Sequence, residues 1–98
     1  LLGRAFGACH GLDLPFVFGT LDRGPVAMFA GSGPAAETLA ERMQDAWLAF
    51  ARTGDPSTPA LGRWPSYEPG ERTTMILGPE CHVERAPFET ERRFWDAG

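Results

Sequence analysis

The segment 34–54, "PAAETLAERMQDAWLAFARTG", constrains the fold more than any other part of the chain, because its apolar residues repeat with helical spacing. Six apolar side chains recur at steps of three and four and predict one packing face: Leu39, Met43, Ala46, Trp47, Phe50 and Ala51. Pro34 suits a first helical position, Gly54 suits a left-handed cap, and Pro56 prevents continuation. We therefore predict a helix over 34–54.

Shorter elements are predicted on the C-terminal side of this helix. Residues 55–72 are rich in proline and read as irregular. The β-branched "TTMIL" and the following "CHVERA" predict an antiparallel hairpin over 73–86, turning at Gly78-Pro79-Glu80. Residues 87–97 predict a final helix that starts at Pro87 and packs through Phe94 and Trp95. On the N-terminal side, 26–30 reads only as a brief apolar stretch between Gly- and Pro-containing breakers.

The chain has more apolar material than regular structure to cover it. Its 98 residues suit at most one small domain. They include three Trp, seven Phe and one Tyr, while 12 Gly and nine Pro interrupt regular elements. We expect four aromatic side chains to seek cover, with a homo-oligomer as the result: Phe16, Phe18, Trp64 and Trp95.

Charge and cysteine content exclude several classes of partner. The net charge is −4 and there is no Lys, which argues against nucleic acid and against an anionic membrane surface. No apolar run approaches the roughly 20 residues of a membrane span. Cys9 and Cys81 do not match zinc-ligand spacing, and we predict free thiols, no metal and no cofactor. The Ala-, Gly- and Arg-rich, lysine-free composition is typical of bacterial coding, and the start at Leu1 suggests a piece of a longer protein.

The strongest functional candidate is His10, in "GACHGLDLPFVFG" (7–19). Small residues on both sides permit a tight loop around its imidazole, and the aromatic block after it can anchor that loop. Asp13 is predicted to hold this loop or to cap the turn that follows, because Asp is a favoured N-cap. Cys9 is not expected to act as a nucleophile, since the side chains of the adjacent residues Cys9 and His10 point apart and no third group orients them. His82 is predicted to be a surface residue of the hairpin.

Four ordered segments resemble the carboxylesterase type B (cholinesterase-like) family of α/β-hydrolases. "GACHGLDLPFVFGTL" is similar to the family pattern H-G-x-[DE]-L-P-[FY]-V-F-G, with His10 on the histidine position. "AWLAFARTGDP" (46–56) resembles the pattern W-x-x-F-A-[KR]-T-G-x-P of the following helix. "RWPSYEPGERTTMIL" (63–77) and "ERRFW" (91–95) resemble the next signature and the C-terminal helix. The likeness spans nearly the whole chain.

The resemblance implies a fold and a reaction. The fold would be an α+β fragment of an α/β-hydrolase, with 1–98 as the C-terminal part of the catalytic domain and 7–19 as its catalytic-histidine loop. His10 would be the general base of a Ser–His–Glu/Asp triad in a serine carboxylesterase acting on carboxylic esters. In this fold the triad order is Ser, acid, His. The 98 residues contain no G-x-S-x-G elbow, so the partner would be an upstream remainder of the domain, and the fragment alone would be inert. A cytoplasmic bacterial enzyme is expected, with secretion left open.

The sequence leaves one alternative open. Because no nucleophile is present in these residues, the chain also fits a non-catalytic interaction or assembly module of the same superfamily. A serine elbow encoded upstream of Leu1 favours the esterase. A non-serine residue at that elbow favours the module.

Overall fold

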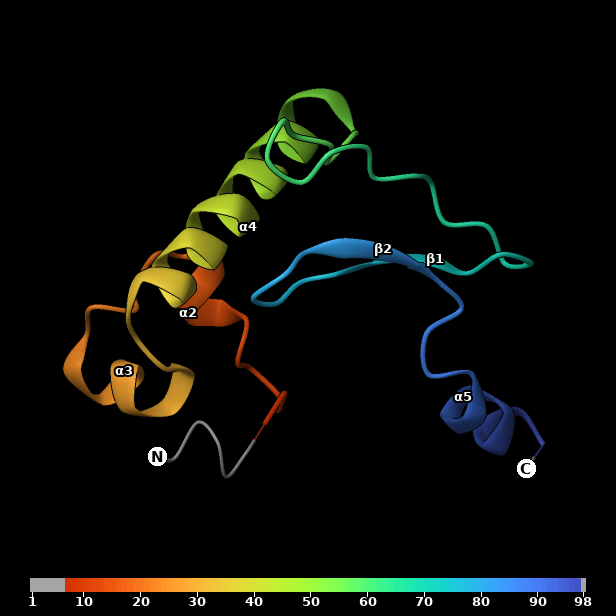
Figure 1. Ribbon diagram of the computed structural model, residues 1–98, viewed down its shortest axis with the longest axis horizontal. Coiled ribbons are helices and arrows are strands. Elements are labelled where there is room, and N and C mark those ends of the chain that lie inside the picture. The colour runs from red at the N-terminus through yellow and green to blue at the C-terminus, as the bar shows by residue number, and fades with distance from the viewer. Residues whose placement is uncertain (1–6, 98) are drawn as a thin grey trace.

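The computed structural model describes residues 7–97 and contains four helices and one hairpin within them. Their bounds, in chain order, are α2 (Leu14–Val17), α3 (Gly24–Ala30), α4 (Pro34–Thr53), β1 (Thr73–Ile76), β2 (His82–Arg85) and α5 (Glu89–Asp96). Helices α2 and α3 lie near the N-terminal end of α4, and the hairpin and α5 extend to the other side (Figure 1). The long helix, the irregular segment, the hairpin and the C-terminal helix predicted from the sequence are all present.

Helix α4 forms where its signals predicted it, but its packed face is shifted. Pro34 stands in the first turn and Gly54 caps the other end with φ 81°. The buried residues are Ala40, Met43 and Ala46. Trp47 and Phe50 were expected on this face, yet they are 58% and 52% exposed. The reason is that α2, which contacts α4, covers the side carrying Ala40 and Met43 instead.

The N-terminal helices close a small apolar core against α4. Phe16 of α2, expected to be left uncovered, is buried with Leu21, Ala40 and Met43. Phe18, at 73% exposed, does remain uncovered. Helix α3 was not expected, because Gly24-Pro25 reads as a breaker; here Pro25 instead occupies the first turn of the helix, where a missing N–H costs nothing.

The hairpin has the predicted antiparallel pairing, and of its two strands β1 is the packed one. Met75 pairs with Val83, and Ile76 pairs with His82. Met75 is only 6% exposed, whereas all four residues of β2 are exposed. The hairpin is therefore held on its β1 side.

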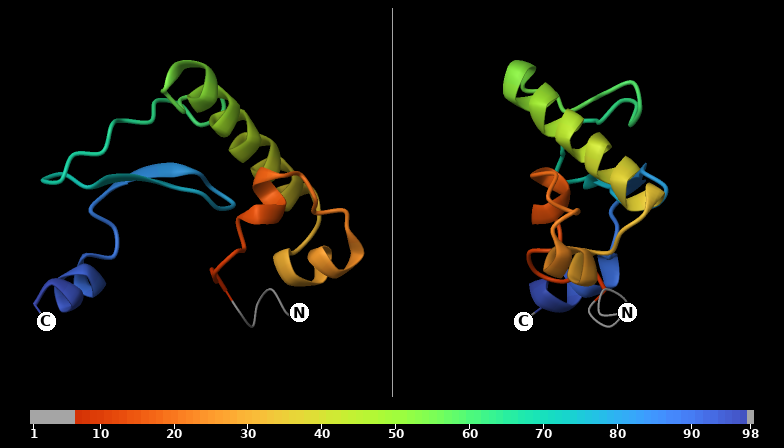
Figure 2. Two further views of the ribbon diagram at one scale, coloured as in Figure 1. Left: turned by 180° about the vertical axis from the view of Figure 1, so that it is seen from behind. Right: turned by 90° about the vertical axis from the view of Figure 1, so that its left-hand side faces the viewer.

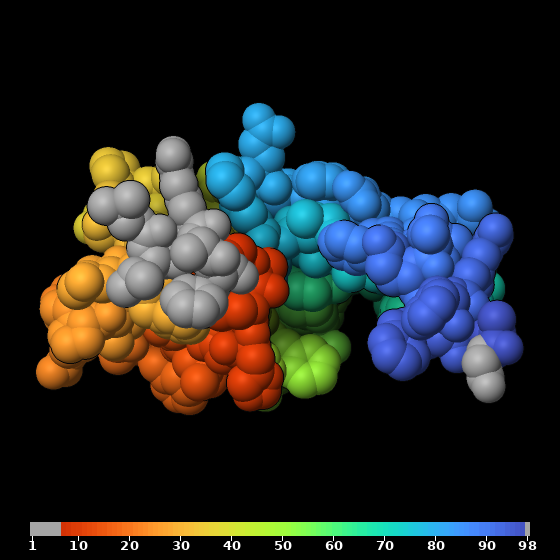
Figure 3. Space-filling view, turned by 90° about the horizontal axis from the view of Figure 1, so that it is seen from below, coloured from red at the N-terminus to blue at the C-terminus, as the bar shows by residue number. Residues whose placement is uncertain are grey.

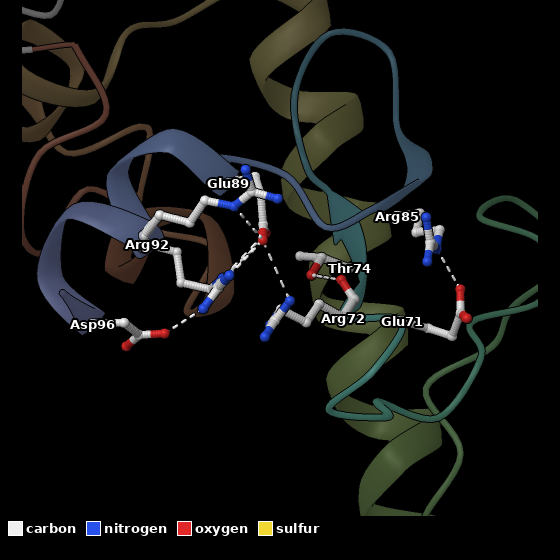
Figure 4. Close-up of polar contacts among 8 residues, drawn as sticks. Glu71, Arg72, Thr74, Arg85, Glu89, Arg92 and Asp96 are labelled. Carbon is white, nitrogen blue, oxygen red and sulfur yellow. Dashed lines mark hydrogen bonds and ion pairs between the residues drawn. The ribbon is translucent and has the colours of Figure 1, made fainter.

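Helix α5 begins two residues later than predicted and is not packed. Phe88 adopts a left-handed conformation with φ 56°, so the helix starts at Glu89 rather than at Pro87. The described chain buries no residue of α5. Phe94 and Trp95, predicted to pack, are 72% and 78% exposed and contact each other edge to face. Polar contacts instead connect α5 to the rest of the chain, through Arg72 and Glu89 (Figure 4).

The molecule is more open than a finished domain of its length. Its radius of gyration is 15.0 Å, against about 13 Å for a compact domain of 100 residues. Its accessible surface is 7423 Å², about a third more than a compact monomer of this mass exposes. Figure 2 shows the extended course from two further sides, and in Figure 3 α5 forms a lobe away from the N-terminal helices. The chain therefore exposes more surface than a compact domain does, and this surface requires contacts with further protein to be buried.

Candidate functional site

His10 lies in a hydrogen-bonded turn that leads directly into α2. The amide of Leu12 donates to the Cys9 carbonyl at 3.2 Å, and the amide of Leu14 donates to the Gly11 carbonyl at 3.3 Å. Gly11 has φ 79°, a conformation that side-chain-bearing residues rarely adopt. The small residues around His10 are therefore what allows the chain to turn there.

The imidazole of His10 faces outward. The residue is exposed, and within residues 7–97 neither ring nitrogen has a hydrogen-bond or ion-pair partner. A histidine bonded on both nitrogens to its own main chain would have no proton-accepting role left to play. Within residues 7–97, both nitrogens of the His10 ring are without such a bond.

Asp13 takes the position predicted for it but not the predicted contact. It is the residue before α2, and its main-chain carbonyl accepts hydrogen bonds from Phe16 and Val17 at 3.1 and 3.0 Å. Its side chain makes no capping hydrogen bond, because the residue already has helical φ and ψ of −69° and −26°. In the described chain it also forms no ion pair with His10. Asp13 therefore shapes the turn through its backbone.

The base of the histidine loop is fixed to α4 in two ways. The Phe16 ring lies in the core beside Met43 and is 8% exposed. In addition, the side-chain amide of Gln44 donates a hydrogen bond to the Phe16 carbonyl at 3.2 Å, across 28 residues. Sequence reasoning missed Gln44, because nothing in the local pattern of the helix tells which loop its polar side chain will meet.

The hairpin turn also lies beside the histidine loop. Figures 1 and 2 show the hairpin tip directed toward α2. Between them is a cavity of about 410 Å³, lined mainly by apolar side chains. Its lining includes Cys9, Leu12, Phe16, Met43, Leu77 and Gly78. The sequence predicted the hairpin, but gave no signal that its tip would meet a loop some 65 residues earlier.

The remaining candidates are His82 and the two cysteines, of which Cys9 also lines the cavity. His82 is exposed, as predicted; its Nε2 lies 2.8 Å from a Glu84 carboxylate oxygen, and this contact raises the pKa of His82. The thiols of Cys9 and Cys81 are both free, and the Cys81 Sγ contacts the Gly78 carbonyl oxygen at 3.5 Å. Within 7–97 no group of His, Cys, Asp and Glu is arranged to hold a metal ion. None of the helices described here is long and apolar enough to cross a membrane.

The fold has close counterparts among solved hydrolases. A carboxylesterase from Geobacillus stearothermophilus superposes with a TM-score of 0.76 at 44% identity, over 90% of this chain and 19% of its own. A para-nitrobenzyl esterase superposes with a TM-score of 0.75 at 40% identity, over 86% of this chain and 17% of its own. The structure is thus an α+β piece of an α/β-hydrolase.

Sequence comparison gives the family. A profile of the carboxylesterase family matches residues 3–95. The para-nitrobenzyl esterase of Bacillus subtilis is 43% identical over 86 residues, which cover 88% of this chain and 17% of that protein. Carboxylesterase 5A of Homo sapiens is 34% identical over 89 residues, covering 85% of this chain and 16% of that protein. The chain belongs to the carboxylesterase family, and it spans about a sixth of the length of these relatives.

Proposed function

We propose that this chain is the C-terminal part of a serine carboxylesterase and that His10 is the general base of its catalytic triad. The observation that carries the proposal is the state of His10: an exposed imidazole with no partner in the described chain, on a turn that is fixed at its base to the core. The match of 7–19 to the family's histidine segment supports the same role.

The chemistry follows from the two ring nitrogens. In the ground state Nδ1–H of His10 donates to a carboxylate that lies upstream, which leaves Nε2 free to accept a proton. When a serine hydroxyl attacks the ester carbonyl, Nε2 takes the serine proton and the ring becomes an imidazolium. That proton then passes to the departing alcohol, and the cycle repeats with water in place of serine. The serine, the acid and the oxyanion donors would come from the upstream part of the protein.

Incomplete burial supports an upstream remainder as the partner of this chain. Several large apolar side chains are more than half exposed, among them Phe18, Trp47, Phe50, Phe88, Phe94 and Trp95. Apolar patches of this kind mark surfaces that pack against something else. In the complete enzyme the rest of the hydrolase domain would cover them; in the isolated chain we expect a homo-oligomer to do so.

The bacterial relatives and the free thiols support a cytoplasmic bacterial enzyme.

A pair of histidine variants tests the catalytic role. We expect His10→Ala in the full-length protein to lower kcat for p-nitrophenyl butyrate by at least about a thousandfold, because removal of a triad member leaves only oxyanion and binding contributions. His82→Ala is the matched control, since it also removes an exposed histidine, and its kcat should stay within about twofold. The isolated 98 residues should show no turnover.

Two results would contradict the proposal. One is wild-type hydrolysis by the His10→Ala protein. The other is an upstream reading frame with no G-x-S-x-G elbow, or no such frame at all. The second result would favour the alternative, a non-catalytic assembly module, for which the exposed aromatic side chains are the supporting observation.

A further inference from the structure

The orientation of the histidine loop depends on how α2 is held. Backbone hydrogen bonds from Leu12 to Cys9, from Leu14 to Gly11 and from Phe16 to Asp13 connect the turn at His10 to α2, so the position of the loop follows that of the helix. Helix α2 has only four residues and cannot be rigid by itself. Its position is therefore set by α4, the one helix with which it makes extensive contact in the described chain.

Gln44 of α4 makes a specific polar contact at this junction. Its amide donates to the Phe16 carbonyl at 3.2 Å, and the same carbonyl also accepts a longer hydrogen bond, at 3.4 Å, from the Gly19 amide at the end of α2. Among the side-chain hydrogen bonds of residues 7–97, only this one reaches the segment 7–19. Phe16 is thus held twice, by its ring in the core and by its carbonyl at Gln44.

The absence of a side chain at Gly19 leaves room for the Gln44 side chain. A Cβ atom at position 19 would lie 2.5 Å from the Gln44 Nε2, closer than real contacts allow. Gly19 also has φ 66°, so a side chain there would strain the backbone as well. The end of α2 and the amide of Gln44 therefore fit together closely.

We propose that Gln44 is a positioning residue for His10, acting through the Phe16 carbonyl and the space left by Gly19. This inference rests on the proposed function of His10 and adds the residue that sets its geometry. A general base must stay within hydrogen-bond reach of its serine, and misplacement by about 1 Å can cost on the order of 100-fold in rate. By fixing α2, Gln44 fixes the loop that carries the imidazole.

The test uses the full-length protein and variants at both positions. Gln44→Met keeps the volume of the side chain and removes the donor. We expect its kcat for p-nitrophenyl butyrate to fall about 10- to 100-fold, with KM within about twofold, because the binding surface is unchanged. Asp45→Asn, an exposed change on the same helix, is the control and should keep wild-type kcat. Thermal unfolding is recorded for every variant.

A double variant separates positioning from general stability. Gly19→Ala should displace the Gln44 amide and lower kcat similarly. Gly19→Ala combined with Gln44→Met should lose little more than either single change, because both remove the same contact. Should Gly19→Ala fail to fold, the Gln44→Met result decides alone.

The outcomes distinguish this inference from the function on which it rests. An inactive His10→Ala protein beside a Gln44→Met protein with wild-type kcat would overturn the role of Gln44 alone. A Gln44→Met protein with a lower Tm and unchanged kcat would do the same, since it would show a merely structural contact. Wild-type activity in His10→Ala would instead remove the proposed function itself.

Discussion

The N-terminal helices and α5 are attached to the molecule by different forces. Helix α2 is held by apolar burial, with Phe16 and Met43 in one core and a hydrogen bond from Gln44 at its end. Helix α5 buries no residue in the described chain and is held by charged contacts, chiefly those of Glu89 (Figure 4). The comparison shows that the region around His10 is held by apolar contacts within the described chain. Helix α5 has no such apolar contacts there.

The difference matters because the two kinds of attachment differ in strength. Burial of an aromatic ring contributes several kcal/mol, and its loss leaves a cavity. Partly exposed ion pairs contribute about 0–1 kcal/mol each, since water and salt screen them. Glu89 faces Arg72, Arg92 and Arg93 together, so α5 depends on a network around a single carboxylate.

The largest expected effect on stability comes from removing one aromatic ring from α2, and the comparison is with the removal of one from α5. In the isolated chain, Phe16→Ala should lower the free energy of unfolding by about 3–5 kcal/mol, because it empties the core between α2 and α4. Phe94→Ala removes a ring of the same size from α5, where it is 72% exposed. Its effect should stay within about 0.5 kcal/mol. Urea unfolding followed by circular dichroism measures both.

Equal losses for the two variants would contradict the comparison. The same pair measured in the full-length protein would sharpen it. If the upstream domain covers α5, Phe94→Ala should cost clearly more there than in the isolated chain, while the cost of Phe16→Ala should change little.

The sequence predicted those features that depend on neighbouring residues. The periodicity between Pro34 and Gly54 was sufficient for α4, and the β-branched run was sufficient for the hairpin. The start of α5 was predicted wrongly, because the left-handed turn at Phe88 is not visible in the local pattern. The helix at 24–30 is not predicted, because the local pattern at Gly24-Pro25 reads as a breaker, whereas Pro25 stands in the first turn of the helix.

The candidate site divides in the same way. The catalytic role of His10 is predicted through the likeness of 7–19 to the family's histidine segment, and the turn found there agrees with the glycine at position 11. The exposure of the imidazole, the amide of Gln44 and the position of the hairpin tip all depend on contacts between distant parts of the chain. Such contacts are decided by the packing of whole elements, so a local pattern does not reveal them.

A smaller effect is expected from the charged attachment of α5. Glu89→Gln should speed amide hydrogen exchange in α5 and leave exchange in α4 unchanged, because it removes the carboxylate shared by Arg72 and Arg92. Glu91→Gln is the matched control, an exposed change on the same helix that has no ion pair in the described chain. Equal exchange rates in the two variants would show that the network does not hold α5.

The same contact should also respond to acid. The hydrogen bond from Arg92, with the nearby charges of Arg72 and Arg93, lowers the pKa of Glu89 from 4.5 to about 2. A lowered pKa in the folded state means that the contact stabilises α5 fully above pH 4.5 and is lost as the pH falls through about 2. The protection of the α5 amides, relative to their intrinsic exchange rate at each pH, should therefore fall over this range before α4 unfolds, and a simultaneous loss of both helices would contradict the separation of the two regions.

The smallest expected effect is at His82, on the exposed strand that leads toward α5. The hydrogen bond with Glu84, supported by the Glu80 carbonyl, raises the pKa of His82 above 6.5. A raised pKa means that the contact stabilises the hairpin fully below pH 6.5 and that this contribution is lost as the pH rises through the folded-state value. The ring signals of His82 in an NMR titration should therefore have a midpoint above 6.5, and Glu84→Gln should return it toward that value. A midpoint that Glu84→Gln leaves unchanged would show that the pair is not formed in solution. In that case charged contacts would stabilise the C-terminal region even less than the contacts of Glu89 indicate.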